Sequence, residues 1–253
     1  ASVWMTMTEK TDINLLLSAT NNFSELGRIL KTCKSCISIS PNVFDSEFEA
    51  HLDLEKAILT IRSKKAEAKI YIDANKDVLC FSIKSEIPVH ITYMIDNYRN
   101  QPLSSHDLEN DFSNYAMSGS ARFHNISESA DIVRISNNSE GIIQYHRNEV
   151  SCYEYSYHAQ NLYSKDKDVY RDPYINRTFG TFAVSNNLNA VNRDGHSVLT
   201  TEKAVFNCKI QIWSLTEKTD SVQSFEEKIT NAANNFNESA SYEMHIKNWK
   251  EYW

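Results

Sequence analysis

The side chains best suited to contact a ligand lie in one stretch of the sequence, between Gly141 and Gly180. They form two polar runs, one at the end of a predicted strand and one after the turn that Asp172-Pro173 predicts. The candidate substrate-binding residues are Tyr145, His146, Arg147, Asn148, Glu149, Asn176 and Arg177. Such side chains offer hydrogen bonds to sugar hydroxyls and, through tyrosine, a planar face for sugar C–H groups. The pattern favours a carbohydrate ligand, although Arg147 could instead pin the loop by pairing with Glu149 or Asp172.

A second strand is predicted after the first polar run, because large and polar residues alternate there. Tyr153, Tyr155 and Tyr157 would lie on one face of this strand, and Glu154 and His158 on the other. The tyrosines could form either a sugar-binding face or an ordinary core face, and the sequence leaves both interpretations open.

Catalysis by this chain alone would need suitably placed acids and bases. Glycoside hydrolysis uses two carboxyl groups roughly 5 to 9.5 Å apart, and Glu149 and Glu154 are carboxyls near the polar runs. A mutarotase-like proton transfer would need a histidine beside a carboxylate, which His146 or His158 could supply with Glu149. Sequence cannot set these separations, so the catalytic residues stay unknown. Neither a nucleophile elbow nor a glycine-rich phosphate loop occurs, and no cofactor is predicted.

No metal site is predicted from the cysteines or from the acidic loops. Cys33 and Cys36 form a C-x-x-C pair on a predicted strand, where residues three apart point to opposite faces. A second C-x-x-C that could complete a zinc site is absent from the sequence. The long polar segment 97–114 carries other possible ligands, His106, Asp107 and Glu109. Their spacing does not place three ligands on one element.

Composition limits the class of protein and its partners. The chain has 253 residues, which suits one large β domain or two small ones, with a hydrophobic content of 41% and a formal net charge of −7. Basic residues form no stripe, so nucleic acid is not expected as a partner. No apolar run reaches the roughly 18 to 20 residues of a membrane span. Because the chain starts at Ala1 without a leader sequence, we expect a mature or excised piece of a protein.

Strand signals recur at intervals of roughly ten residues along most of the chain. Segment 48–54 alternates apolar and polar residues as a half-buried strand would, and segments 78–83 and 89–94 are predicted as separate strands. About fifteen strands precede residue 216, more than a small immunoglobulin-like sandwich contains. The sequence therefore predicts a mainly β fold with a large two-sheet antiparallel sandwich.

The last part of the chain changes to helical periodicity. Asp220 and Gln223 have the spacing of a capping box at the start of a helix. The apolar face of that helix would contain Val222, Phe225, Ile229 and Ala232. Asn237 would cap a second helix with an aromatic stripe that includes Trp249 and Trp253. The stripe would either pack as core on the sandwich or on another domain, or form a sugar-stacking or membrane face. We expect further structure beyond Trp253 to cover it.

Several stretches of the sequence together resemble a known family. They include YHRNE at 145–149, NRTFG at 176–180 and the final H-x-x-x-W-x-x-x-W at 245–253. On these motifs the chain resembles the N-terminal β domain of bacterial glycoside-hydrolase-like proteins, a domain-of-unknown-function family that precedes a six-hairpin (α/α)6 toroid. The resemblance implies a β-supersandwich of the galactose-mutarotase-like kind over residues 1–218. It also implies a helical linker toward the toroid over residues 219–253.

The resemblance further implies an accessory role in a carbohydrate-active protein. The domain would help to form a sugar cleft and would meet the toroid through Trp249 and Trp253, while the catalytic carboxylates would lie in the toroid. The parent protein would be a secreted or periplasmic glycoside hydrolase. Two alternatives stay open, a stand-alone sugar-acting enzyme (glycosidase, mutarotase or epimerase) and a structural, adhesion-like β protein.

Overall fold

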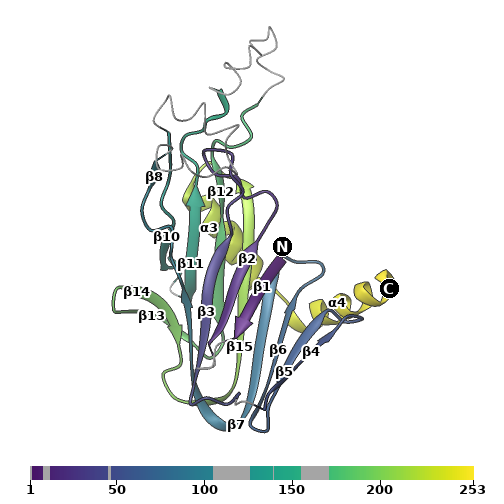
Figure 1. Cartoon of the computed structure of the whole chain (residues 1–253). Coiled ribbons are helices and arrows are strands. Elements are labelled where there is room, and N and C mark those ends of the chain that lie inside the picture. Colours follow the sequence, from purple (N-terminus) through teal and green to yellow (C-terminus); the bar gives the residue numbers. More distant parts are fainter. Residues whose placement is uncertain (1, 8–11, 45–46, 105–125, 139, 155–170) are drawn as a thin grey trace.

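The computed structural model describes residues 2–7, 12–44, 47–104, 126–138, 140–154 and 171–253 (Figure 1). The strands form a two-layer antiparallel sandwich, and two helices follow at the C-terminal end of the chain. The first layer has the strand order β1–β2–β3–β7–β14–β13. The second layer has the order β4–β5–β6–β7–β15–β12–β11–β10. The predicted fold class, a mainly β antiparallel sandwich with two C-terminal helices, is therefore confirmed.

The two layers contain strands of very different length. The first layer contains β1 (Ser2–Met7), β2 (Ile13–Ser18), β3 (Cys33–Ser40), β13 (Asn189–Arg193) and β14 (His196–Thr200). The second contains β4 (Glu49–Asp53), β5 (Ile58–Arg62), β6 (Ala66–Ile72), β10 (Ile132–Ile135), β11 (Gly141–Arg147), β12 (Arg177–Ser185) and β15 (Val205–Lys218). Strand β7 (Val78–Ile95) belongs to both layers, and the short strands β8 (Leu103–Ser104) and β9 (Ser127–Glu128) pair with each other.

Strand β7 joins the two layers. Its first part pairs with β6 and β15, and its last part, from His90 to Ile95, pairs with β3 and β14. The chain stays extended through the mostly exposed residues 84–88, where it passes from one layer to the other. Segments 78–83 and 89–94 are therefore one strand, and the prediction of two separate strands is wrong.

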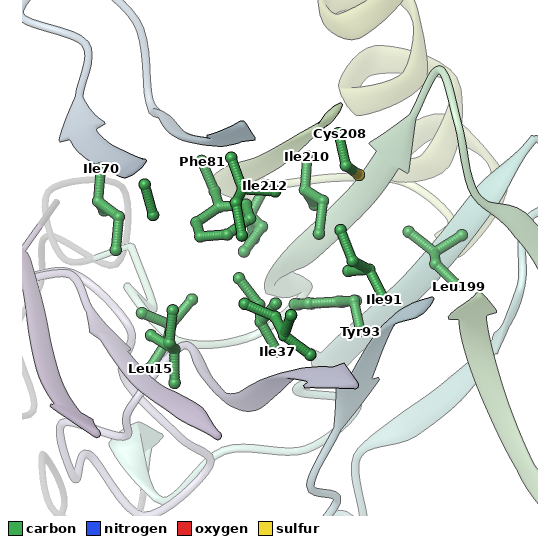
Figure 2. Packing of buried hydrophobic residues seen from close by; sticks show 14 of the residues in the cluster. Leu15, Ile37, Ile70, Phe81, Ile91, Tyr93, Leu199, Cys208, Ile210 and Ile212 are labelled. Carbon is green, nitrogen blue, oxygen red and sulfur yellow. The ribbon is translucent and has the colours of Figure 1, made fainter. Parts of the chain in front are cut away.

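The main hydrophobic core lies between the layers (Figure 2). Strand side chains alternate between faces, so every second residue of β2 is buried while its neighbours are half-buried. The largest fully buried core residues include Leu15, Ile37, Phe81, Ile91 and Tyr93. On β3, Cys33 is buried and Cys36 half-buried on the opposite face, and both thiols are free. The placement of the C-x-x-C pair on a strand is confirmed.

A second apolar cluster lies on the outer face of the second layer, under helix α3 (Val222–Asn234). Phe225 and Ile229 of the helix are buried there against side chains such as Trp213 of β15. Burying two large apolar side chains contributes about 3 to 6 kcal/mol relative to leaving them exposed. This cluster fixes α3 on the face of the sheet formed by β12 and β15.

The start and the buried stripe of α3 differ from the prediction. The helix is capped by Ser221, whose hydroxyl accepts a hydrogen bond from the Ser224 N–H, so the capping box with Asp220 at its N-cap is wrong. The apolar stripe also ends differently, because Ala232 is exposed and Ala233 packs against the cluster. The stripe follows the i, i+4, i+8 positions from Phe225, one of the two spacings that a 3.6-residue repeat allows.

Helix α4 (Glu238–Tyr252) is anchored to two turns of the second layer. Asn237 caps it as predicted, since its side chain accepts the Ala240 N–H. His245 is fully buried; its Nδ1 accepts the Ala74 N–H at 3.1 Å and its Nε2 donates to the Lys56 carbonyl at 2.7 Å. These bonds require a neutral ring with the proton on Nε2. The division of the chain at residues 218 and 219 stays a prediction.

The aromatic stripe of α4 covers the sandwich only in part. Tyr242 and His245 contact the ring of Tyr71, with centroids 5.5 and 4.9 Å away. Toward the end of the helix Trp249 is half-buried, and Trp253 is 67% exposed. At the end of the stripe the Trp253 indole N–H donates to the Leu54 carbonyl at 2.8 Å, while most of the ring stays exposed. Within the described part of the chain, no helix is long and apolar enough to span a membrane.

Two further predictions differ from the structure. Segment 48–54 contains the predicted strand, β4, but the strand is not half-buried: both of its faces are exposed, and Leu52 is 54% exposed. Tyr153 and Glu154 are helical, not extended, and the Ser151 hydroxyl accepts the Tyr153 N–H as a local cap. Other predicted residues lie outside the described ranges, namely His106, Asp107, Glu109, Tyr155, Tyr157 and His158.

Candidate functional site

Strand β11 divides the predicted binding residues between two environments. Gln144 and His146 lie on its core face, while Tyr145 and Arg147 lie on the outer face near α3. This division follows from the alternation of strand side chains. His146 is fully buried and stacks on Phe179 of the neighbouring strand β12, with ring centroids 4.9 Å apart.

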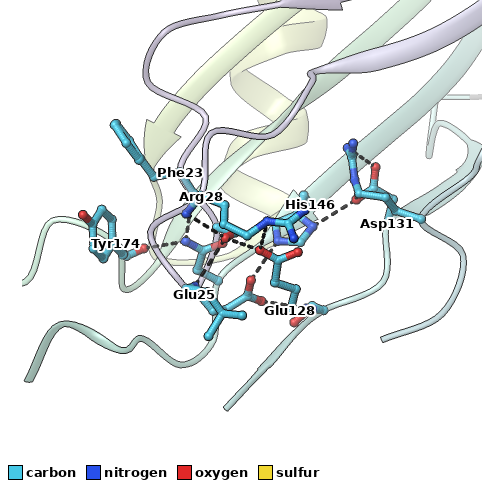
Figure 3. A network of polar contacts seen from close by, with 12 residues as sticks. Phe23, Glu25, Arg28, Glu128, Asp131, His146 and Tyr174 are labelled. Carbon is cyan, nitrogen blue, oxygen red and sulfur yellow. Dashed lines mark hydrogen bonds and ion pairs between the residues drawn. The ribbon is translucent and has the colours of Figure 1, made fainter. Parts of the chain in front are cut away.

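Both ring nitrogens of His146 contact carboxylates (Figure 3). Nδ1 lies 2.9 Å from Oδ1 of Asp131, and Nε2 lies 3.0 Å from Oε2 of Glu25. Burial lowers the pKa of His146, but its hydrogen bonds to the two carboxylates outweigh burial and raise the pKa from 6.5 to about 9. The ring is therefore an imidazolium at neutral pH, and both of its N–H groups donate.

Asp131 is held by two donors besides His146. Arg99 reaches both of its oxygens, with Nε 3.0 Å from Oδ1 and a terminal nitrogen 2.5 Å from Oδ2. The Gln144 amide donates to Oδ2 at 2.5 Å. A bidentate guanidinium contact fixes the plane of the carboxylate as well as its position.

The remaining carboxylates of the site contact backbone and side-chain donors. Glu25 Oε1 accepts the Ser129 N–H at 3.0 Å. Glu128 Oε1 accepts the Ser24 hydroxyl at 2.5 Å and lies 3.1 Å from Nε of Arg28. Burial raises the pKa of Glu128, while the Ser24 hydrogen bond and the Arg28 charge act in the opposite direction.

We refer to the charged members of this site as the His146 network, which consists of Glu25, Arg28, Arg99, Glu128, Asp131 and His146. Its formal charges balance, with three carboxylates against one imidazolium and two guanidinium groups. Charges in a protein interior need such pairing, because removing one partner leaves an uncompensated charge. Both nitrogens of His146 are occupied as donors, so the arrangement holds segments together and leaves the ring no free site to accept a proton.

On the outer face, Arg147 ties β11 to the connection before α3. Its guanidinium donates to the Thr219 carbonyl at 3.0 Å and to Asn176 Oδ1 at 3.2 Å. Arg147 therefore pins neighbouring segments, but its partners are not the predicted Glu149 or Asp172. Glu149 is exposed at the end of the polar run.

Asn148, Asn176 and Arg177 interlock with the loop that supplies Glu25. The Asn148 amide donates to the Phe23 carbonyl at 2.8 Å, and the Asn176 N–H donates to the Asn148 carbonyl at 2.9 Å. Asn176 has a φ of 62°, a left-handed conformation that asparagine tolerates better than most residues. Arg177 donates to the Asn21 carbonyl at 2.9 Å. The structure thus brings these residues together as supports of one loop.

The partners of His146 carry little signal in the linear sequence. Glu25 and Arg99 come from remote segments, whereas Asp131 directly precedes β10, the antiparallel neighbour of β11, where Ile132 pairs with Tyr145. Strand β11 itself carries a signal. Gln144 and His146 lie on the same face as Ile142, which is part of the main core, so two polar side chains are buried on a core face. Buried polar groups require partners, so this face predicts a polar network without identifying its members.

A cavity of about 460 Å³ adjoins the His146 network, and we call it the Tyr98 cleft. Its wall includes three network residues and three residues that follow β7, namely Arg28, Arg99, Glu128, Tyr98, Asn100 and Gln101. The Tyr98 ring is 50% exposed, and the guanidinium carbon of Arg99 lies 4.8 Å from its centroid. The predicted substrate-binding residues do not line this cleft. The cleft combines an aromatic face, exposed amides and a fixed guanidinium group.

Within the described residues, no group of three or more His, Cys, Asp and Glu side chains could hold a metal ion.

A comparison with curated proteins finds no match to the chain. In a comparison with protein-family models, a family model matches the chain over residues 1–253. The expected membership of a domain-of-unknown-function family is thereby confirmed, without any link to glycoside hydrolases. The chain belongs to the family described as Domain of unknown function (DUF5703).

Proposed function

We propose that this chain is an accessory β-sandwich domain of a carbohydrate-active protein, and that the Tyr98 cleft binds the sugar. The observation that carries the proposal is the half-exposed Tyr98 ring beside polar groups in a cavity of about 460 Å³. Sugars bind through C–H contacts with an aromatic face and hydrogen bonds to their hydroxyls. Asn100 and Gln101 supply exposed amide groups for such bonds.

The rigidity of the cleft wall supports this proposal. Arg99 is bound to Asp131 through two hydrogen bonds, and Arg28 is paired with Glu128, so both guanidinium groups are in place before a ligand arrives. A preformed site loses less conformational entropy on binding than a site that must be ordered. In this proposal His146 of the first polar run holds Asp131, which in turn holds Arg99 in the cleft wall, and Tyr98 contacts the sugar.

A positioning role for His146 also supports an accessory domain over a stand-alone sugar enzyme. A general base must be within hydrogen-bond reach of the substrate and must have a free site for the proton. His146 has no exposed surface, and both of its nitrogens are engaged. The catalytic groups in this proposal belong to a second domain, as the resemblance implies.

The end of α4 is the segment that we propose meets that second domain, an (α/α)6 toroid. Trp253 is 67% exposed and Tyr252 is 74% exposed, and Trp249 lies half-buried beside them. Aromatic residues of this kind are enriched at interfaces. The reading frame downstream of residue 253 tests this part of the proposal, since it should encode a helical domain. Location outside the cytoplasm remains part of the same proposal.

Calorimetric titration of the chain with a panel of neutral oligosaccharides tests the sugar site. We expect binding to at least one member of the panel and a loss of about tenfold or more in affinity for Tyr98→Ala. Tyr98→Phe keeps the ring and should retain most of the affinity. The control is Tyr252→Ala, which removes a tyrosine on α4 that is more exposed than Tyr98 and should leave binding unchanged.

Two results would count against the sugar site. One is the absence of binding heat across the panel with a folded sample. The other is equal affinity in the wild type and in Tyr98→Ala. Unfolding curves for each variant would show whether a loss of binding comes from the cleft or from a loss of fold.

A further inference from the structure

Strand β1 forms one edge of the first layer. In the described part of the chain it pairs with β2 alone, from Ser2 opposite Ser18 to Met7 opposite Ile13. Its other side therefore presents a row of backbone N–H and C=O groups to a neighbour. Such an edge is a template for pairing with another strand.

The charge of β1 sets it apart from the other edge strands of the sandwich. Strand β4 carries Glu49 and Asp53, β10 carries Arg134 and β13 carries Arg193. Strand β1 reads SVWMTM and contains no ionisable side chain. Charged side chains are one of the means by which proteins prevent pairing at sheet edges, and β1 lacks this protection.

An open cavity of about 630 Å³ lies directly beside β1. Its lining is mixed. Val3 and Met5 of β1 and Leu52, Leu59 and Ile72 of the facing layer form its apolar part, and Asp73, Lys76 and Asp77 add charged groups. Leu52 is 54% exposed, so part of this apolar surface contacts solvent. A strand added to the edge of β1 would place every second side chain over this surface.

We propose that the occupant of this edge is β1 of a second copy of the chain, so that two β1 strands pair antiparallel about a two-fold axis. An added strand needs apolar side chains at alternate positions to cover the apolar part of the cavity. Strand β1 has them, because Val3, Met5 and Met7 lie on its half-buried face. A two-fold interface uses the same surface on both copies, so one self-complementary strand is sufficient.

Charge opposes the association of two copies over most of the surface, and it opposes their association least at the β1 edge. Each chain carries a formal net charge of −7, so most approaches of two copies bring like charges together. At the β1 edge the two strands meet without any charged side chain at their contact. Trp4, which is 67% exposed, lies on the outward face of β1, where its counterpart from the other copy would cover part of it.

Sedimentation velocity tests the pairing across concentrations of about 1 to 100 μM, the range expected of a small interface. We expect the wild type to change from monomer to dimer over this range. Trp4→Lys and Thr6→Lys each place a charge on an exposed position of the edge strand and should weaken dimerisation by about tenfold or more. Asn192→Lys makes the same kind of substitution on the exposed face of the edge strand β13 and should dimerise like the wild type.

An excess of a capped peptide that copies residues 2–7 should dissociate the wild-type dimer, because it occupies the same edge. The proposal is overturned if the wild type remains a monomer at the highest concentration. It is also overturned if a dimer forms and both lysine variants of β1 associate as tightly as Asn192→Lys. Both lysine variants alter exposed side chains, so circular dichroism should confirm that they are folded.

Discussion

The carboxylate of Glu25 and the imidazole of His146 lie 3.0 Å apart in a fully buried ion pair, although 121 residues separate them in the chain. The pair fastens a loop of the first layer to β11 of the second layer. Around it, hydrogen bonds from Asn148 and Arg177 hold the carbonyls of the same loop. The polar motifs near 145–149 and 176–180 therefore organise the end of the sandwich that carries the Tyr98 cleft.

Removing the charge of His146 should destabilise the fold strongly. In His146→Gln, Glu25 loses its cationic partner within the interior, and breaking a buried ion pair in this way costs about 3 to 5 kcal/mol. The free energy of unfolding, measured by chemical denaturation, should fall by this amount. Glu149→Gln changes an exposed carboxylate in the same polar run and is the matched control, with no expected change. A change of less than about 1 kcal/mol in His146→Gln would contradict a structural role for the network.

The same ion pairs predict how stability depends on pH. The pKa of His146 is raised from 6.5 to about 9 in the folded protein. The stabilisation is therefore fully present below about pH 6.5, where folded and unfolded chains both hold the proton, and it is lost as the pH rises through about 9. The total loss should be roughly 3 kcal/mol.

The measurement for this pH prediction compares the wild type with His146→Gln. The difference between their free energies of unfolding should decrease from about pH 6 to about pH 10, because only the wild type loses the proton of residue 146. Titrating groups outside the His146 network affect both proteins alike and cancel in the difference. A difference that stays constant over this range would mean that His146 is not charged in the folded state.

Much of the fold could be predicted from the sequence because local patterns determine it. Alternating apolar residues indicated most strands, and Asn237 has the side chain that caps a helix. The errors arose where the deciding interaction is tertiary. The polar segment 84–88 stays extended because β7 pairs in both layers, and β4 is exposed because no layer covers it.

The candidate site was predictable only in part, for a related physical reason. The polar run around His146 is visible in the sequence, and its importance for the architecture follows from the observed contacts. Its partner Glu25 is an isolated acidic residue 121 positions away, which only folding brings to the ring, whereas Asp131 adjoins β10, the hairpin neighbour of β11. The Tyr98 cleft was missed because its wall joins loops that have no shared motif.

Glycine at position 180 is required by close packing of β12 on β11. A Cβ atom at Gly180 would lie 1.9 Å from the Gln144 carbonyl oxygen, which is part of the backbone and cannot rotate away. Gly180→Ala should therefore cost more than about 3 kcal/mol, above the usual range for overpacking. Gly195→Ala is the control, since nothing lies within 4 Å of its Cβ position and only its φ of +80° opposes alanine, at about 1 to 2 kcal/mol. Thermal unfolding of both variants would rank them, and equal midpoints would contradict the predicted clash.

The attachment of α3 depends on one buried carboxylate that the amphipathic pattern does not reveal. Glu226 is 4% exposed and accepts hydrogen bonds from Arg134 at 2.5 Å and from the Asn137 N–H at 2.7 Å. Arg134 retains some contact with solvent, so loss of the pair should cost less than in a fully buried site. We therefore expect Glu226→Gln to lower the free energy of unfolding by about 2 kcal/mol.

The next residue of the helix provides a control with the same chemistry. Glu227→Gln removes a carboxylate from the exposed face of α3, where it accepts a hydrogen bond from Gln223, and should change stability by less than about 0.5 kcal/mol. Hydrogen exchange should also distinguish the variants, because only Glu226→Gln weakens the contact between α3 and the segment that follows β10. Faster exchange of α3 amides is therefore expected in Glu226→Gln and not in Glu227→Gln. Equal exchange in both variants would mean that apolar burial of Phe225 and Ile229 alone holds the helix on the sheet.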